Sequence, residues 1–265
     1  MAFILTEVVP WGRSFNEYRQ MFRLSDHDLR LSIVGCADGP ASFNAELTQH
    51  GGRVVSCDPI YKFNADHIKS RIDATYDDVL DQTRIHPSNF VWSSIQSIEE
   101  LGRIRMAAML TFLEDYERGG KGGRYLAAQL SALPFKDASF DLALCSHFLF
   151  LYSGHLSLSF HRHAITEMCR VARQVRIFPL IDLDLRPSPY VGQLMIELRE
   201  TGFTVSIETV PYEFQRGGNK MMRIAFGKDD GKYTARDMNF PAKPYGLGRS
   251  IAGGRGAPYK RQSLI

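Results

Sequence analysis

The sequence predicts an α/β fold in which helices cover both faces of a mostly parallel sheet. Two observations lead to this prediction. Short apolar runs alternate with segments of helical periodicity, and only a turn separates the last two runs. A length of 265 residues, 44% of them hydrophobic, is enough for one large domain with a substantial core.

Two strands joined by a helix begin the predicted sheet. Ser14 is expected to cap the first helix, and Pro40 suits the first turn of the second, where its missing N–H costs nothing. A strand, a helix and a further strand form a βαβ unit with a right-handed crossover. The expected helices are 12–29 and 40–49, and the expected strands are 31–34 and 54–57.

A long helical stretch separates the second strand from the third and ends at the glycine-rich run 119–123. Connections between consecutive parallel strands are usually much shorter. We therefore interpret 62–122 as a helical insertion that can act as a lid. Its expected helices are 65–80, 95–101 and 103–116.

Five further apolar runs complete the sheet. The last two are joined by the turn 215–219 and should pair as an antiparallel hairpin. We thus predict a Rossmann-like doubly wound sheet, mostly parallel with one antiparallel strand, in a single domain over 1–227. The strands are 124–128, 140–145, 175–181, 203–210 and 221–226, with helices at 164–172 and 190–200.

Positive charge is concentrated at the C-terminal end. The formal net charge is +3, but 228–265 alone has eight basic and three acidic residues, a net +5. This segment is rich in glycine and poor in large aliphatic residues, so we expect it to be disordered. Contact with nucleic acid through it is an alternative that we do not favour over a plain extension.

The apolar and cysteine patterns favour a cytoplasmic protein without membrane contact. No apolar run approaches the roughly 18 residues of a membrane span, and the first residues do not form a secretory signal. The four cysteines show no CxxC spacing, so buried reduced thiols are expected and no metal site is predicted.

The carboxyl ends of the first two strands have a ligand-binding pattern. Ligands of doubly wound sheets bind at this edge, and Gly35, Ala37 and Gly39 let a nucleoside or amino acid approach the backbone. Asp58 follows Gly39 by 19 residues, near the roughly 20 at which an acidic residue binds ribose hydroxyls. A helix or turn cap before Pro59 is the alternative role of Asp58.

Four sequence blocks follow one another along the chain: Gly35-Cys-Ala-Asp-Gly39, Ser56-Cys-Asp58, the run 131–147 and Glu167-Met-Cys-Arg-Val171. Together they resemble the successive signatures of class I S-adenosylmethionine-dependent methyltransferases, in the style of the ubiquinone-type small-molecule group. Leu-Pro-Phe followed by Ser-Phe-Asp is the most specific part. The resemblance covers about 31–226, apart from the insertion.

The resemblance implies S-adenosylmethionine as the cofactor and a small molecule as the methyl acceptor. Gly35, Ala37 and Gly39 would line the methionine part of the cofactor, and Asp58 would hold its ribose. The chain departs from the family at Ile33, where an acidic residue is usual, at Ala37, where glycine is usual, and near 173–174, where a Gly-Gly pair is usual.

Further positions follow from the same resemblance. Gln129 and Leu130 match the pair that grips the adenine, and Cys145 lies at the end of the fourth strand, next to the methyl group. His147 follows it and is a candidate general base, or alternatively a packed residue that shapes the acceptor site. The turn after Tyr212 frames the acceptor or is a simple hairpin loop.

Two alternative functions remain open at the level of sequence. The basic C-terminal segment suits a methyltransferase that acts on RNA or protein. The substitutions at Ile33, Ala37 and Gln129 suit a non-catalytic module that binds the cofactor for regulation.

Overall fold

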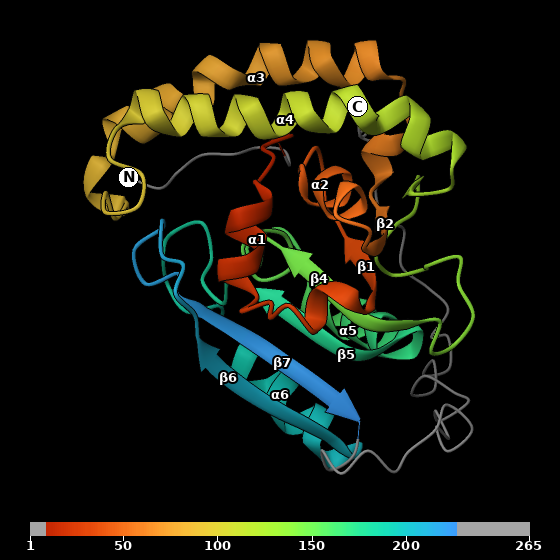
Figure 1. Ribbon diagram of the computed structural model, residues 1–265. Helices are drawn as coiled ribbons and strands as arrows, with labels where there is room; N and C mark the ends of the chain where they lie inside the picture. Colours follow the sequence, from red (N-terminus) through yellow and green to blue (C-terminus); the bar gives the residue numbers. More distant parts are fainter. Residues whose placement is uncertain (1–8, 227–265) are drawn as a thin grey trace, which may run out of the picture.

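The computed structural model describes residues 9–226, which form a seven-stranded sheet between two layers of helices (Figure 1). The strand order is β3-β2-β1-β4-β5-β7-β6, and β7 is antiparallel to both of its neighbours. The predicted Rossmann-like fold with one antiparallel strand is confirmed. The strands are β1 Ser32–Cys36, β2 Arg53–Cys57, β3 Tyr125–Leu126, β4 Phe140–Ser146, β5 Ala172–Phe178, β6 Phe203–Thr209 and β7 Lys220–Phe226.

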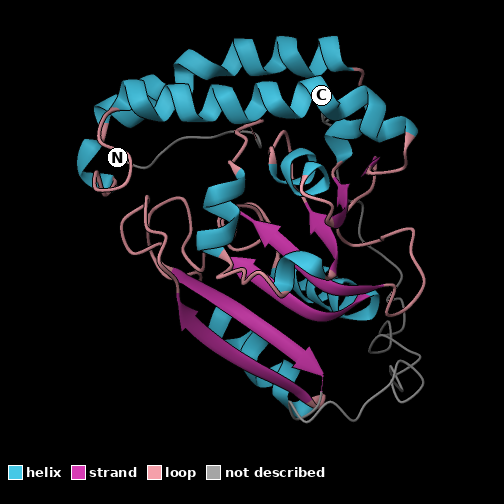
Figure 2. Cartoon of the chain, viewed as in Figure 1, coloured by secondary structure: helices cyan, strands magenta, loops and turns pink. Residues whose placement is uncertain are grey.

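The helices divide between the two faces of the sheet, and strand side chains alternate accordingly (Figure 2). On β1, Ile33 belongs to the apolar cluster of α1 and α2, whereas Val34 belongs to the cluster of α5 and α6. The helices are α1 Phe15–Met21, α2 Phe43–Gln49, α3 Ala65–Ile85, α4 Ile98–Lys121, α5 Leu158–Val171 and α6 Val191–Glu200, with short 3-10 turns at Asp28–Arg30, Pro59–Lys62 and Pro87–Asn89.

Four of the predicted helices have different bounds for identifiable local reasons. The first ends at Met21 because the chain turns at Arg23, whose backbone is left-handed with φ of 47°. The second begins at Phe43, because Pro40 lies in a turn before the helix instead of in its first turn. The segments 95–101 and 103–116 form one helix, α4, capped by the Ser97 hydroxyl.

The helices α3 and α4 of the predicted insertion lie across the edge of the sheet toward which β1, β2 and β4 point (Figure 1). At one end, the Tyr116 hydroxyl on α4 donates to the carbonyl oxygens of Tyr61 and Phe63, both at 2.8 Å. At the other end, Val91 donates its N–H to the carbonyl oxygen of Phe214 at 2.8 Å. The insertion is therefore attached both to the end of β2 and to the β6–β7 connection. Its role as a lid stays a prediction.

Within residues 9–226, no helix combines the length and the apolar character that crossing a membrane requires. All four cysteines are buried, as expected. The basic segment 228–265 lies outside the described residues.

Tyr116→Phe removes the hydroxyl that anchors α4. Two buried carbonyl groups lose their shared donor, so we expect the free energy of unfolding in urea to fall by about 1–3 kcal/mol. Tyr190→Phe is a matched control, because the Tyr190 hydroxyl makes no hydrogen bond within the described residues, and it should cost about 0.5 kcal/mol or less. Equal losses in the two variants would contradict the anchoring role.

Candidate functional site

The loop after β1 has the shape of a ligand cradle. Ala37 and Gly39 both adopt left-handed backbone, with φ of 56° and 55°. A Cβ atom at Gly35 would lie 1.7 Å from the Oδ2 of Asp38, whereas one at Gly39 would meet nothing within 4 Å. Gly35 is therefore needed for the chain's own packing, and the backbone at Gly39 is open to a ligand.

Asp58 lies beside this loop, at the end of β2. Its Oδ2 accepts the Gly39 N–H at 2.9 Å and its Oδ1 accepts the Ile60 N–H at 2.8 Å. The second contact makes Asp58 the cap of the 3-10 turn at Pro59–Lys62, so the alternative role is present. Each oxygen retains a lone pair for a further donor, and burial raises the pKa of the carboxyl. The two roles are therefore compatible, and the ribose contact stays a prediction.

Asp38 is a carboxylate that the sequence did not single out. Its oxygens accept the Tyr18 hydroxyl at 2.9 Å and the Ser56 hydroxyl at 2.6 Å. Burial raises the pKa of Asp38 to about 6, even though the hydrogen bonds from Ser56 and Tyr18 oppose that shift. Asp38 thus holds the loop between α1 and β2. No local pattern marks it, because Tyr18 is 20 residues away.

The remaining predicted cofactor residues lie near the same strand ends. Leu130 and Cys145 are buried in one apolar cluster with Cys36 and Cys57. Cys36 pairs in register with both Cys57 and Cys145, so the three thiols lie on adjacent strands. Gln129 is exposed. The structure therefore places Leu130 and Cys145 in the same buried cluster as the end of β1 and leaves the Gln129 side chain accessible to a ligand.

His147 follows β4 in a fixed, half-buried position. Its backbone is left-handed, with φ of 50°, and its N–H donates to the Phe178 carbonyl oxygen at 2.7 Å. Its Nδ1 lies 2.9 Å from the Ser146 hydroxyl, and Tyr212 packs at 6.4 Å between ring centroids. Burial, and then the charges of Arg13 and Arg105, lower the pKa of His147 well below its ordinary value. The ring is neutral at pH 7 and retains one basic nitrogen.

A buried ion pair lies close to His147. Arg105 on α4 is fully buried and donates to Glu17 Oε2 at 2.5 Å, while the Tyr212 hydroxyl donates to Glu17 Oε1 at 2.8 Å. Burial would raise the pKa of Glu17, but Arg105 and Arg13 lower it to about 2. Glu17 and Ser14 form a capping box, which confirms the predicted cap. Because this motif by itself explains a glutamate at this position, the sequence does not reveal the ion pair of Glu17 with Arg105.

Arg13 lies in the segment before α1, and its backbone contacts the residue before α2. Its carbonyl oxygen accepts the Ser42 N–H at 3.1 Å, and its Nη1 donates to the Trp11 carbonyl oxygen at 2.5 Å. Within the described residues Arg13 forms no ion pair with a carboxylate. Burial and the neighbouring Arg105 lower the pKa of Arg13 to about 10. It remains charged at pH 7.

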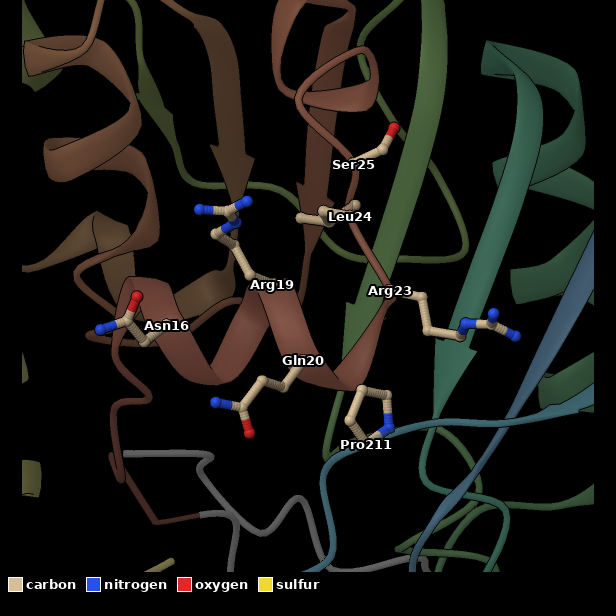
Figure 3. Close-up of a pocket in the computed structure, with 7 residues that line it drawn as sticks. All are labelled: Asn16, Arg19, Gln20, Arg23, Leu24, Ser25 and Pro211. Atoms are coloured by element: carbon tan, nitrogen blue, oxygen red, sulfur yellow. The ribbon is translucent and has the colours of Figure 1, made fainter.

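A separate depression lies on the outer side of α1 and includes Asn16, Gln20 and Pro211 in its lining (Figure 3). Its arginines have acidic partners, because Arg19 lies 3.0 Å from Asp26 and Arg23 lies 3.7 Å from Glu208. None of the predicted site residues lines it. This depression is therefore separate from the predicted site at the strand ends.

The fold agrees with what known proteins show. A family model described as a methyltransferase domain matches residues 106–175, from α4 into β5. Together with the sheet order, this match identifies the chain as a class I S-adenosylmethionine-dependent methyltransferase. An uncharacterised protein of Methanocaldococcus jannaschii is 33% identical over 221 residues, which cover 83% of this chain and 97% of that protein. The chain belongs to the same family as that protein.

Solved methyltransferases are also similar in structure, at low identity. Magnesium protoporphyrin IX methyltransferase of Synechocystis is 11% identical over 80% of this chain and 91% of its own, with a TM-score of 0.42. The 1,6-didemethyltoxoflavin N1-methyltransferase of Burkholderia thailandensis is 13% identical, covers 74% and 71%, and scores 0.40. A putative RNA methyltransferase of Pyrococcus horikoshii is 10% identical, covers 80% and 85%, and scores 0.41.

Glu17→Gln leaves the buried Arg105 without its carboxylate partner. We expect the free energy of unfolding at pH 7 to fall by about 3–5 kcal/mol, as is typical when one member of a buried ion pair is removed. Glu197→Gln breaks the pair with Arg162, whose side chain is 43% exposed, and should cost about 1 kcal/mol or less. Urea unfolding of both variants measures the difference.

The same variant tests the lowered pKa. In the native protein the contribution of Glu17 is fully present above its unfolded pKa and is lost as the pH falls from about 5 toward about 2. Glu17→Gln should therefore lose less stability than the native protein across that range. Parallel acid profiles for the two proteins would contradict the assignment.

Proposed function

We propose that this methyltransferase binds S-adenosylmethionine at the loop of Gly35, Ala37 and Gly39 and methylates a small-molecule acceptor beside His147. The observation that carries this proposal is the pairing of the open backbone at Gly39 with the Asp58 carboxylate, 2.9 Å apart, at the carboxyl ends of β1 and β2. That edge is where ligands bind in doubly wound sheets.

The residues present fit this cofactor. The open cradle suits its methionine part, Asp58 has lone pairs for ribose hydroxyls, and the exposed amide of Gln129 can bind the adenine next to the apolar Leu130. Bound there, the cofactor supplies an electrophilic methyl group. The contribution of the chain is to orient the acceptor against that methyl group in a site from which water is excluded.

The enclosure of the site supports a small acceptor. The insertion, anchored by Tyr116 at one end and by Val91 at the other, lies over the strand ends, and Arg105 on α4 is fully buried beside His147. An acceptor must fit beneath α4, which suits a metabolite better than a folded RNA or protein. The RNA or protein alternative depends on the segment 228–265, outside the described residues.

His147 is the residue proposed to take the acceptor's proton. As the acceptor atom takes the methyl group that a bound cofactor would supply, its proton would pass to the free ring nitrogen of His147. The Phe178 carbonyl and the Ser146 hydroxyl fix the backbone and the ring that this transfer requires.

Asp58→Ala tests the cofactor site. We expect the native protein to bind S-adenosylmethionine in isothermal titration calorimetry and the variant to bind about tenfold more weakly or worse, because the charge-assisted bonds to the ribose are lost. Asp26→Ala removes an exposed carboxylate and should leave the affinity unchanged. Equal affinities of Asp58→Ala and the native protein would reject the ribose role, and a native protein that does not bind would reject the proposed cofactor site.

Methyl transfer itself is measured with a labelled donor and a cell extract, followed by mass spectrometry of the labelled product. We expect a labelled metabolite, and a turnover lower by about 10²–10⁴-fold in His147→Gln with unchanged cofactor affinity. Label in RNA or protein would favour the alternative acceptors, and cofactor binding without any product would favour the non-catalytic module. Full activity of His147→Gln would show that this side chain only shapes the site.

A further inference from the structure

The acceptor side of the site has more positive than negative charge. Arg13 and Arg105 both act electrostatically on His147 and on Glu17, and Glu17 is the carboxylate whose charge opposes theirs. Tyr212 stays protonated at pH 7, because burial and the Glu17 charge raise its pKa. The cluster of Arg13, Arg105, Glu17, Tyr212 and His147 therefore has a net charge of +1.

Two hydrogen-bond donors in this cluster have no protein partner. The Nε atoms of Arg13 and Arg105 are both buried and make no hydrogen bond within the described residues. A buried donor left without an acceptor costs about 1–3 kcal/mol, and more when the donor is charged. Excess positive charge and unpartnered guanidinium donors in one place are the properties of an anion site.

We propose that Arg13 and Arg105 bind an acidic group, a carboxylate or a phosphate, on the methyl acceptor. This inference rests on the proposed function of the site. It narrows the acceptor to an anionic small molecule whose acidic group lies against the two arginines while its methylated atom faces His147.

The position of the arginines favours the acceptor over the donor as the source of the anion. The donor side of the site is acidic, since Asp58 lies beside Gly39 and Asp38 belongs to the cradle loop itself. Arg105 lies on the other side, where it reaches Tyr212 at 3.4 Å and Tyr212 packs on His147. Arg13 acts electrostatically on both Arg105 and His147. The carboxylate of the donor's methionine is the competing occupant, because the Arg13 backbone contacts Ser42 near the cradle.

An anionic acceptor would also activate the proposed base. The charges that act on His147 are those of Arg13 and Arg105, while Ser146, Phe178 and Tyr212 contact its ring without charge. An acidic group bound to the arginines offsets their charge and raises the pKa of His147 toward its ordinary value. The base then becomes stronger only when the acceptor is bound.

The test uses nuclear magnetic resonance of the His147 ring in the full chain, with and without saturating S-adenosylhomocysteine, whose own carboxylate occupies the donor's place. His147→Gln identifies the resonance among those of the eight histidines. In the saturated protein, acetate and inorganic phosphate are expected to move the resonance saturably and to raise the pKa of His147 by about one pH unit or more, whereas neutral acetamide is not. The better of the two anions distinguishes a carboxylate site from a phosphate site.

Arg13→Gln should weaken the anion response about tenfold or more, and Arg13→Lys, which keeps the charge, should restore part of it. Arg19→Gln is the matched control, because Arg19 is exposed and already paired with Asp26. Calorimetry with S-adenosylhomocysteine should give the same affinity for Arg13→Gln as for the native protein.

Three results would overturn the inference. The first is a native protein whose His147 resonance does not respond saturably to either anion, and the second is an unchanged response in Arg13→Gln. The third is a pair of observations: Arg13→Gln loses affinity for S-adenosylhomocysteine, and S-adenosylhomocysteine abolishes the anion response of the native protein. Together they would assign Arg13 to the donor's carboxylate. If S-adenosylhomocysteine does not bind at all, the proposed function fails, and the titration of the free protein still decides whether the anion site exists.

Discussion

A buried guanidinium needs a carboxylate partner, and this requirement organises the site. Arg105 is fully buried on α4, so the inserted helix can pack where it does only if Glu17 on α1 meets it. Tyr212, from the connection between β6 and β7, binds the same carboxylate. Arg105 and Tyr212 lie 88 and 195 residues from Glu17 along the chain, so one carboxyl group joins three distant segments. The enclosure of the strand ends depends on this contact.

The charges around the strand ends are segregated. Asp58 and Asp38 lie at the cradle, whereas Arg13, before α1, and Arg105, on α4, act electrostatically on His147. A histidine between acidic and basic groups could in principle gain or lose a proton at neutral pH, but here burial and the arginines act in the same direction. The ring is therefore neutral, and its side-chain hydrogen-bond partner among the described residues is the Ser146 hydroxyl and not a carboxylate.

Local signals were sufficient to predict the sheet and the cradle. The alternation of apolar runs with helical segments, the turn 215–219 and the resemblance together gave the strand arrangement that the structure confirms. The predicted end of the first helix was wrong, because the left-handed backbone at Arg23 ends α1 early. The β6–β7 turn after Tyr212 was recognised as a possible frame for the acceptor, but its contact with Glu17 was not.

The unpredicted part of the site consists of long-range pairs. Arg105 lies within a regular helical pattern, and Glu17 satisfies a capping box by itself, so neither sequence position shows that a partner is missing. Arg13 is one basic residue among the 32 in the chain. Only the folded arrangement brings Arg13 and Arg105 within electrostatic reach of one glutamate and one histidine.

The departure from the family at Ile33 has a physical counterpart in Asp38. Ile33 is fully buried in the apolar cluster that contains Tyr18 and Phe43, where a carboxylate would need partners that this cluster lacks. The hydroxyl of Tyr18 instead reaches Asp38, five residues further along the chain, and Ser56 supplies the second donor. Ile33 on the strand thus packs in the same cluster as Tyr18, and the Tyr18 hydroxyl binds the Asp38 carboxylate in the loop. The loop retains a buried acidic group, and the packing of α1 on the sheet holds it in place.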